Sequence, residues 1–145
     1  MDKTAWKGQC DRRPKPWGHE LVWPALAQLH GKLLFVERGN RTSFKYHTHK
    51  NEVFYFVSGT AQVTYTDESW LRNKNNAPLR CEVFKPGDTL TVMAMCPYRI
   101  EAKDDCEIIE IGTLNNSPTV RLKDDYGRQL GQVYEASETI EVTDE

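Results

Sequence analysis

The chain has 145 residues and a mass of 16.8 kDa, the size of a single domain with one hydrophobic core. Nineteen basic and 21 acidic residues leave a net charge of −2, which argues against a nucleic-acid partner. Mean hydropathy is −0.66, and no apolar run approaches the roughly 18 residues that a transmembrane helix needs. The first residues lack the apolar segment of a signal peptide, so we expect a cytoplasmic protein without a membrane partner.

Charge is distributed unevenly along the chain. Residues 1–16 carry five basic and two acidic groups, whereas residues 129–145 carry five acidic groups and no basic one. The two ends could attract each other within one chain or between subunits, but two solvated termini are the interpretation we favour. We expect an N-terminal arm over residues 1–13, a folded domain over 14–128 and an acidic tail or edge strand over 129–145.

The strongest hydrophobic period is two residues, which is typical of strands half buried in a sheet. A short helix is predicted over residues 24–30, and a polar hairpin loop over residues 67–80. Strands are predicted over residues 32–37, 42–48, 53–57, 61–66, 81–84, 89–93, 98–102, 107–111 and 119–122, with weak patterning near 132–134 and 139–142. Many short strands separated by Gly- and Pro-containing turns predict an all-β sandwich or barrel.

The segment His47-Thr48-His49-Lys50-Asn51-Glu52 carries metal-ligating residue types. Alternate residues of a strand share a face and lie about 7 Å apart along it, so His47 and His49 are expected to point the same way. Both imidazoles could reach one ion at about 2.1 Å, and Glu52 at the start of the next strand could add a carboxylate. Two imidazoles and one carboxylate suit non-haem Fe(II), Mn or Zn. A chance pair of surface histidines is the alternative interpretation.

Other residues give weaker signals. Lys45 lies two residues before His47 and is expected on the same strand face, where a cation would attract an anionic substrate. His30 has no paired ligand spacing and is interpreted as solvated or structural. Arg99 is expected at the surface, and Trp17 is interpreted as a structural plug or a subunit contact.

These residues resemble the first motif of the cupin superfamily, G-x5-HxH-x3/4-E-x6-G. The interval from Glu52 to Gly59 matches that motif, whereas Gly39 lies two residues too far from His47 and only two residues separate His49 from Glu52. The shorter HxHxxE form is similar to the C-terminal cupin domain of type II mannose-6-phosphate isomerases. The resemblance implies a cupin double-stranded β-helix, that is, a jelly-roll barrel.

Two further segments extend this resemblance over about residues 14–128. The first is Pro16-Trp17-Gly18-His19-Glu20, and the second is the run from Val120 to Arg128, which ends in Asp125-Tyr126-Gly127-Arg128. Three separated motifs in the right order are far more specific than a pair of histidines alone.

The second cupin motif, G-x5-P-x-G-x2-H-x3-N, is altered in this chain. Counted from Gly87, Tyr98 stands where the motif has its histidine. Three roles for Tyr98 stay open. It could ligate a metal after losing its phenolic proton, whose ordinary pKa is about 10, it could hydrogen-bond to a bound water or substrate, or it could only fill space.

The resemblance implies a small metal-binding cupin that acts on a sugar or sugar-phosphate-like molecule in an isomerase-like reaction. A divalent Fe, Mn, Zn, Ni or Cu ion would be the Lewis acid. The implied metal set is His47, His49, Glu52 and Tyr98, and the implied catalytic set is Tyr98 and Lys45. A non-haem iron dioxygenase and a non-catalytic ligand-binding cupin are the alternatives. The expected partners are a small molecule, with an anionic one favoured by Lys45, and a second copy of the chain in a homodimer.

Overall fold

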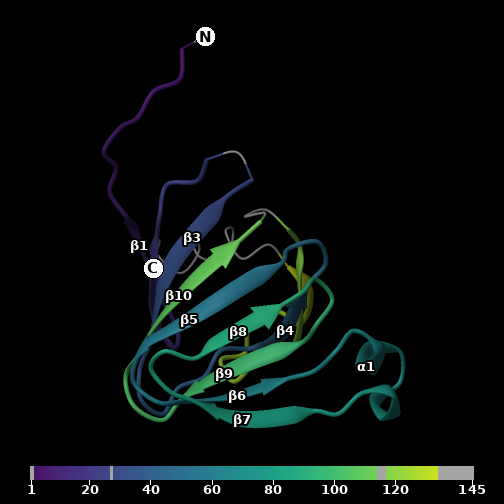
Figure 1. Cartoon of the computed structure of the whole chain (residues 1–145). Helices are drawn as coiled ribbons and strands as arrows, with labels where there is room; N and C mark the ends of the chain where they lie inside the picture. The colour runs from purple at the N-terminus through teal and green to yellow at the C-terminus, as the bar shows by residue number, and fades with distance from the viewer. Residues whose placement is uncertain (1, 27, 114–116, 134–145) are drawn as a thin grey trace.

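The computed structural model describes residues 2–26, 28–113 and 117–133 and consists mainly of β-strands (Figure 1). They form two six-stranded antiparallel sheets, in the orders β1-β2-β3-β10-β5-β8 and β12-β11-β4-β9-β6-β7. The strands are β1 (Asp11–Lys15), β2 (Gly18–Val22), β3 (His30–Val36), β4 (Phe44–His47), β5 (Glu52–Ser58), β6 (Ala61–Tyr65), β7 (Arg80–Phe84), β8 (Thr89–Val92), β9 (Tyr98–Ala102), β10 (Cys106–Gly112), β11 (Thr119–Lys123) and β12 (Gly131–Val133). All nine firmly predicted strands are present within a few residues of their predicted ends, and the all-β prediction is confirmed.

The predicted hairpin loop over 67–80 is confirmed, because this stretch connects β6 and β7, which pair antiparallel. The predicted helix over 24–30 does not form in residues 24–26 and 28–30. Instead, the amides and carbonyls of Leu26 and Leu29 pair in an isolated β-bridge, and β3 begins at His30, although residue 27 lies outside the described residues. The polar loop over 67–80 holds a short helix, α1 (Ser69–Arg72), and a 3₁₀ turn, η1 (Lys74–Asn76). None of the helices in the described ranges has the length and apolar character needed to cross a membrane.

The hairpin of β1 and β2 was absent from the predicted strands because its sequence is polar and contains Pro14. Its turn is the Pro-Trp-Gly segment. Gly18 has φ +152°, and a Cβ there would lie 1.9 Å from the Phe35 carbonyl oxygen, so this close approach of two strands requires glycine. The Trp17 side chain is only 4% exposed and packs in the core, which supports its interpretation as a structural plug.

The core fills the space between the two sheets. Along β5, buried Glu52, Phe54 and Phe56 alternate with exposed Val53, Tyr55 and Val57, as the period of two predicts. The core cluster consists of Trp17, Leu34, Val36, Phe54, Phe56, Ala61, Val63, Phe84, Leu90, Val92, Tyr98, Ile100, Ala102, Cys106 and Ile108. Register places Gly112 opposite both Glu52 and His30, so the start of β3, the start of β5 and the end of β10 meet at one end of the barrel.

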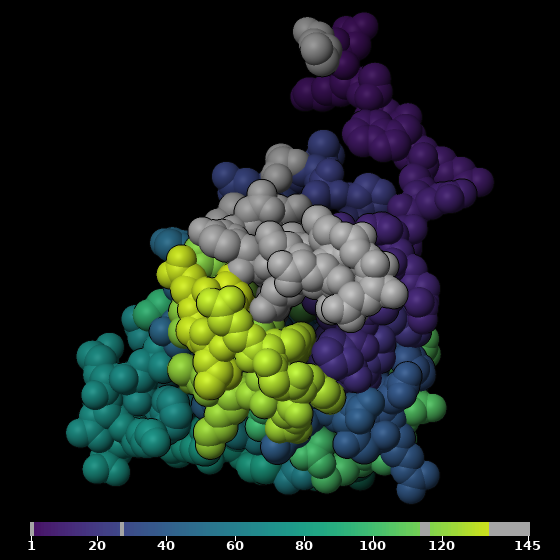
Figure 2. Space-filling model, turned by 180° about the vertical axis from the view of Figure 1, so that it is seen from behind, coloured from purple at the N-terminus to yellow at the C-terminus, as the bar shows by residue number. Residues whose placement is uncertain are grey.

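The two ends of the chain differ. Residues 2–10 are exposed, form no strand and project away from the barrel (Figures 1 and 2). At the other end, β12 pairs with β11, whereas the remainder of the predicted acidic tail, with the weak pattern at 139–142, lies outside the described residues. The three predicted domain boundaries stay predictions.

Candidate metal centre

Three donor groups from three strands converge at the barrel end where β5 begins. The Tyr98 hydroxyl of β9 donates a hydrogen bond to Glu52 Oε1 of β5 over 2.9 Å. His47 Nε2, at the end of β4, lies 3.1 Å from the same carboxylate oxygen and 3.5 Å from the Tyr98 hydroxyl. All three residues are buried, with 4%, 2% and 3% exposure for His47, Glu52 and Tyr98. The three donor atoms therefore form a compact triangle shielded from solvent.

Thr119 fixes the orientation of the His47 ring. Thr119 stands opposite His47 in the pairing of β11 with β4, and its Oγ1 lies 2.8 Å from His47 Nδ1. A ring that donates its Nδ1–H to Thr119 keeps the Nε2 lone pair for a metal ion, and histidine ligands in metalloproteins are usually held in this way.

The second oxygen of Glu52 faces a different set of groups. Lys50 Nζ lies 3.2 Å from Glu52 Oε2 and 3.1 Å from Glu110 Oε2. His30 Nε2 lies 3.0 Å from the same Glu110 oxygen, and Lys32 Nζ lies 3.8 Å from it. We call the groups around His47 and Tyr98 the Oε1 side of Glu52, and those around Lys50, Glu110 and His30 the Oε2 side.

Both central carboxylates are held in the charged form. Burial raises the pKa of Glu52, but the charges of His47 and Lys50 outweigh burial and hold that pKa well below its usual range. Glu110 is buried beside Glu52, and both raise its pKa, yet the charges of Lys32 and Lys50 bring it below the ordinary value. Two adjacent ionised carboxylates create a strong preference for positive charge nearby.

The Oε1 side matches the ligand spacing of a single metal ion. Ligands bonded at about 2.1 Å to one tetrahedral or octahedral ion lie about 3.0–3.4 Å from each other. The observed separations within the triangle are 2.9, 3.1 and 3.5 Å. Imidazole and carboxylate are ordinary ligands of Fe, Mn and Zn. The residues present therefore fit one divalent transition-metal ion.

A second group also has metal-ligand residue types. One ligand atom each from His30, Glu52 and Glu110 lie within 4.8 Å of one another, all three side chains being buried. Lys50 distinguishes this group from the first, because its ammonium already contacts both carboxylates. The two candidate sets share Glu52 and lie on opposite sides of its carboxylate.

The structure does not bring His49 to either set. The prediction that His47 and His49 share one strand face is wrong, because β4 ends at His47 and the chain bends at residues 48 and 49. His49 is exposed, its Nδ1 lies 2.9 Å from Thr48 Oγ1, and its amide donates to Ser117 Oγ. After the bend, Lys50 is the next side chain to turn into the barrel.

Lys45 does lie on the face that carries the site. It is directly opposite Tyr98 in the pairing of β4 with β9, and directly opposed residues of an antiparallel pair point to the same face. Its side chain is half-buried. The strand pairing thus puts Lys45 on the same sheet face as Tyr98, as the strand periodicity predicts.

Several residues of the site were not identified from the sequence. Glu110, Lys50 and His30 have no motif spacing, and His30 is buried rather than solvated. A usable signal existed in β10, where Cys106, Ile108 and Glu110 occupy alternate inward positions, so that a carboxylate follows two apolar residues on the buried face. Such a charged residue at a core position predicts a buried ionic partner.

Arg99 also differs from its predicted surface position. It is 8% exposed, and its Nε donates a hydrogen bond to the Thr42 carbonyl. Asp125 covers it on the outside of the barrel, at 3.6 Å from Arg99 Nη2. The side chain faces away from the barrel interior, as expected, but the Asp124–Arg128 segment shields it from solvent.

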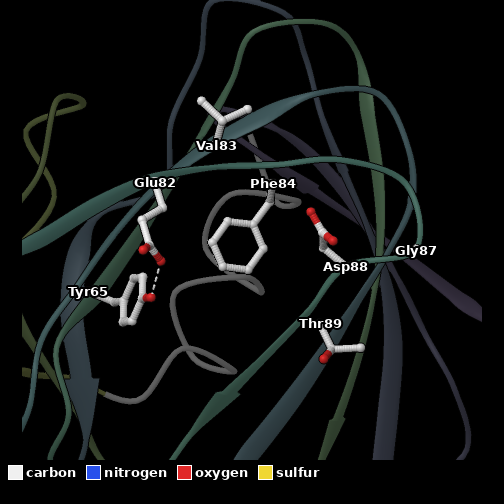
Figure 3. A pocket seen from close by; sticks show the side chains of 7 residues that line it. All are labelled: Tyr65, Glu82, Val83, Phe84, Gly87, Asp88 and Thr89. Carbon is white, nitrogen blue, oxygen red and sulfur yellow. Dashed lines mark hydrogen bonds between the residues drawn. The ribbon is translucent and has the colours of Figure 1, made fainter.

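A separate open pocket of about 600 Å³ lies between β7 and β8, which are the free edges of the two sheets (Figure 3). It is lined by Tyr65, Glu82, Val83, Phe84, Gly87, Asp88 and Thr89. The Tyr65 hydroxyl donates to the Glu82 carboxylate, and Asp88 accepts a hydrogen bond from the Lys85 amide. The lining includes no member of the triangle, so the pocket is distinct from the candidate centre.

Comparison with known proteins assigns the chain to a family. The sequence model described as mannose-6-phosphate isomerase C-terminal matches residues 5–101. The chain belongs to this family. The chain is also similar to the alginate biosynthesis protein AlgA of Pseudomonas aeruginosa. The two are 29% identical over 117 residues, which cover 79% of this chain and 22% of AlgA. The chain thus spans about a fifth of the length of that relative.

Superposition on solved structures shows that this chain has the cupin fold. The oxalate decarboxylase of Lactobacillus farciminis superposes with a TM-score of 0.63 at 16% identity, covering 78% of this chain and 33% of the decarboxylase. A cupin superfamily protein of Desulfitobacterium hafniense gives a TM-score of 0.53 at 15% identity, over 66% of this chain and 75% of that protein. Identities this low establish the fold alone, and the predicted cupin jelly roll is confirmed.

Proposed function

We propose that this cupin binds one divalent transition-metal ion through His47, Glu52 and Tyr98 and isomerises a small sugar or sugar phosphate. The observation that carries the proposal is the buried triangle of donor atoms, whose separations of 2.9, 3.1 and 3.5 Å suit one ion. Membership of the isomerase C-terminal family supports the reaction class. His49 is left outside the proposed ligand set because its ring is exposed and beside Thr48.

The bound ion would supply Lewis acidity that polarises a carbonyl of the substrate. Interconversion of an aldose and a ketose also requires a group that takes a proton from one carbon and returns it to the next. Tyr98 and Glu52 share one proton across 2.9 Å, and Tyr98 is the member of this pair that carries it. We assign to Tyr98 the third donor position and, because it carries its proton, the role of the acid that returns a proton to the substrate, which would leave a phenolate on the ion.

Lys45 is proposed to hold the anionic group of the substrate. It lies opposite Tyr98 on the same sheet face, so an anion bound there would place the rest of a small substrate beside the triangle. Replacing Lys45 with Met should therefore raise KM for phosphorylated sugars and leave KM for the matching free sugars nearly unchanged. An equal effect on both classes would contradict this role.

The reaction class is tested with metal-loaded protein and a panel of phosphorylated aldoses and ketoses in deuterated water. The proposal predicts interconversion with deuterium incorporated at the carbon next to the carbonyl. His47→Ala should abolish this activity, and His49→Ala, two residues away, is the matched control that should retain it. Substrate-dependent oxygen uptake would instead establish the dioxygenase alternative. Metal-dependent binding without turnover would establish a ligand-binding cupin.

A further inference from the structure

We infer that the Lys50 ammonium is a built-in cation that closes the Oε2 side of Glu52 to metal ions. The chain then takes one ion, at the Oε1 side, and none at His30, Glu52 and Glu110 while Lys50 is present. Only the position of the first ion rests on the proposed function. The exclusion at the second set follows from the placement of Lys50.

If Lys50 is left aside, the side chains on the Oε2 side are those of a metal site. One imidazole and two carboxylates, from the three strands β3, β5 and β10, offer ligand atoms within 4.8 Å of one another. This donor set suits Zn, Mn or Fe. Glu52 Oε2 is also buried without a hydrogen bond of good geometry among the described residues, so this oxygen retains a lone pair for a cation.

The Lys50 ammonium supplies positive charge beside the carboxylates of Glu52 and Glu110. Its Nζ lies 3.2 Å from Glu52 Oε2 and donates a hydrogen bond of 3.1 Å to Glu110 Oε2, and the residue is 5% exposed. The position is set by the backbone, because Lys50 stands between the end of β4 and the start of β5. A lysine there is tethered to the sheet and cannot be lost as a bound ion can.

The ammonium and a divalent ion at the Oε2 side would compete for the same oxygens. An ion bonded to Glu52 and Glu110 would lie in direct contact range of Nζ, and two buried positive charges that close repel strongly. The side chains of His30 and Lys50 both pack over Gly112, where an added Cβ would lie 2.6 Å from His30 Cδ2 and 3.1 Å from Lys50 Cε.

The Oε1 side differs in the groups that contact its oxygen. Glu52 Oε1 contacts His47 Nε2 and the Tyr98 hydroxyl, whereas the contact of Lys50 is with Oε2. An ion on this side would also be separated from Lys50 by the carboxylate itself. Lys50 thus offsets part of the negative charge of Glu52 and Glu110 and directs the ion to His47.

The test measures metal stoichiometry on the full chain with Co²⁺ as the probe, by elemental analysis after removal of excess metal. Wild type is expected to retain one ion per chain, and Lys50→Met, a neutral replacement of similar length, two. Adding His30→Gln to Lys50→Met should return the count to one. Lys50→Arg, which keeps the positive charge, is the matched control and should stay at one.

The outcomes separate this inference from the proposed function. If wild type retains no ion and Lys50→Met retains one that is lost with His30→Gln, the proposed centre fails and the role of Lys50 stands. If Lys50→Met gains no ion, or if wild type loses its ion with His30→Gln and keeps it with His47→Gln, the inference is overturned. The comparison of His30→Gln with His47→Gln needs no Lys50 variant, so a wild-type ion that depends on His30 overturns the inference even if Lys50→Met does not fold.

Discussion

The Tyr98 hydroxyl and the Glu52 carboxylate meet across the barrel at 2.9 Å, and this hydrogen bond joins β9 of one sheet to β5 of the other. Tyr98 stands where the second cupin motif has a histidine. The substitution keeps a polar atom directed at the centre and replaces a neutral imidazole with a hydroxyl that carries a proton. The altered motif is therefore a change of chemistry at a retained position.

Restoring histidine at this position should strengthen metal binding. Tyr98→His is expected to raise the affinity for Zn²⁺ or Co²⁺ by about tenfold, because imidazole is a better ligand than a neutral phenol. Competition with a coloured chelator measures the change. Equal affinity in wild type and Tyr98→His would show that the side chain at 98 does not reach the ion.

Removing the hydroxyl should have the opposite effect. Tyr98→Phe removes the hydroxyl that donates to the buried Glu52 Oε1, so we expect weaker metal binding and a loss of about 1–3 kcal/mol in the free energy of unfolding of the metal-free protein. Urea denaturation measures the stability. An unchanged midpoint together with unchanged metal affinity would assign Tyr98 a space-filling role.

A side chain at position 112 is expected to destabilise the fold. The Cβ of an alanine at this position would meet the His30 ring at 2.6 Å and Lys50 Cε at 3.1 Å, so Gly112→Ala must shift the His30 ring and crowd Lys50. Overpacking of this kind costs about 1–3 kcal/mol. Ile111→Ala, on the outward face of the same strand with 52% exposure, is the control that should cost far less. Similar losses for the two variants in urea denaturation would contradict the close packing of His30 and Lys50 against Gly112.

The segment after β11 should make stability depend on pH. Burial raises the pKa of Asp124, but hydrogen bonds from the Arg128 side chain and amide outweigh it and hold the pKa below the ordinary value of 3.8. A carboxyl with a depressed pKa in the folded state contributes stability that is present above its ordinary pKa and lost as pH falls through the depressed value.

Asp124→Asn therefore should be less stable than wild type near neutral pH, and the difference should shrink as pH falls from about 5 to below about 3. Thermal unfolding across this range measures it. The exposed Asp104→Asn is the matched control, with a small difference at every pH. A gap between Asp124→Asn and wild type that stays constant down to the lowest pH would contradict the assigned cause.

The strands were predictable because period-two burial depends only on neighbouring residues. β5 shows the alternation directly, and motif spacing and strand parity pointed to the candidate-site residues Glu52, His47 and Lys45, whose roles stay predictions. The β1–β2 hairpin was not predicted, because Trp17 and its partner strand β3, rather than β propensity, hold its polar residues in the sheet.

The place of His49 could not be predicted from parity because parity holds only while the strand continues. The chain bends directly after His47. After that bend Lys50, and not His49, points into the barrel. The contacts of Glu110 with His30 and Lys50 join residues that are 80 and 60 positions apart, and only the fold brings them together. The homodimer, the cytoplasmic location and the absence of a nucleic-acid partner stay predictions.

Anomalous diffraction from crystals loaded with Co²⁺ tests the central claim most directly. The account predicts one strong peak per chain, at bonding distance, about 2.1 Å, from His47 Nε2 and Glu52 Oε1. A peak bonded to His49, or one between His30 and Glu110 with Lys50 displaced, would contradict it.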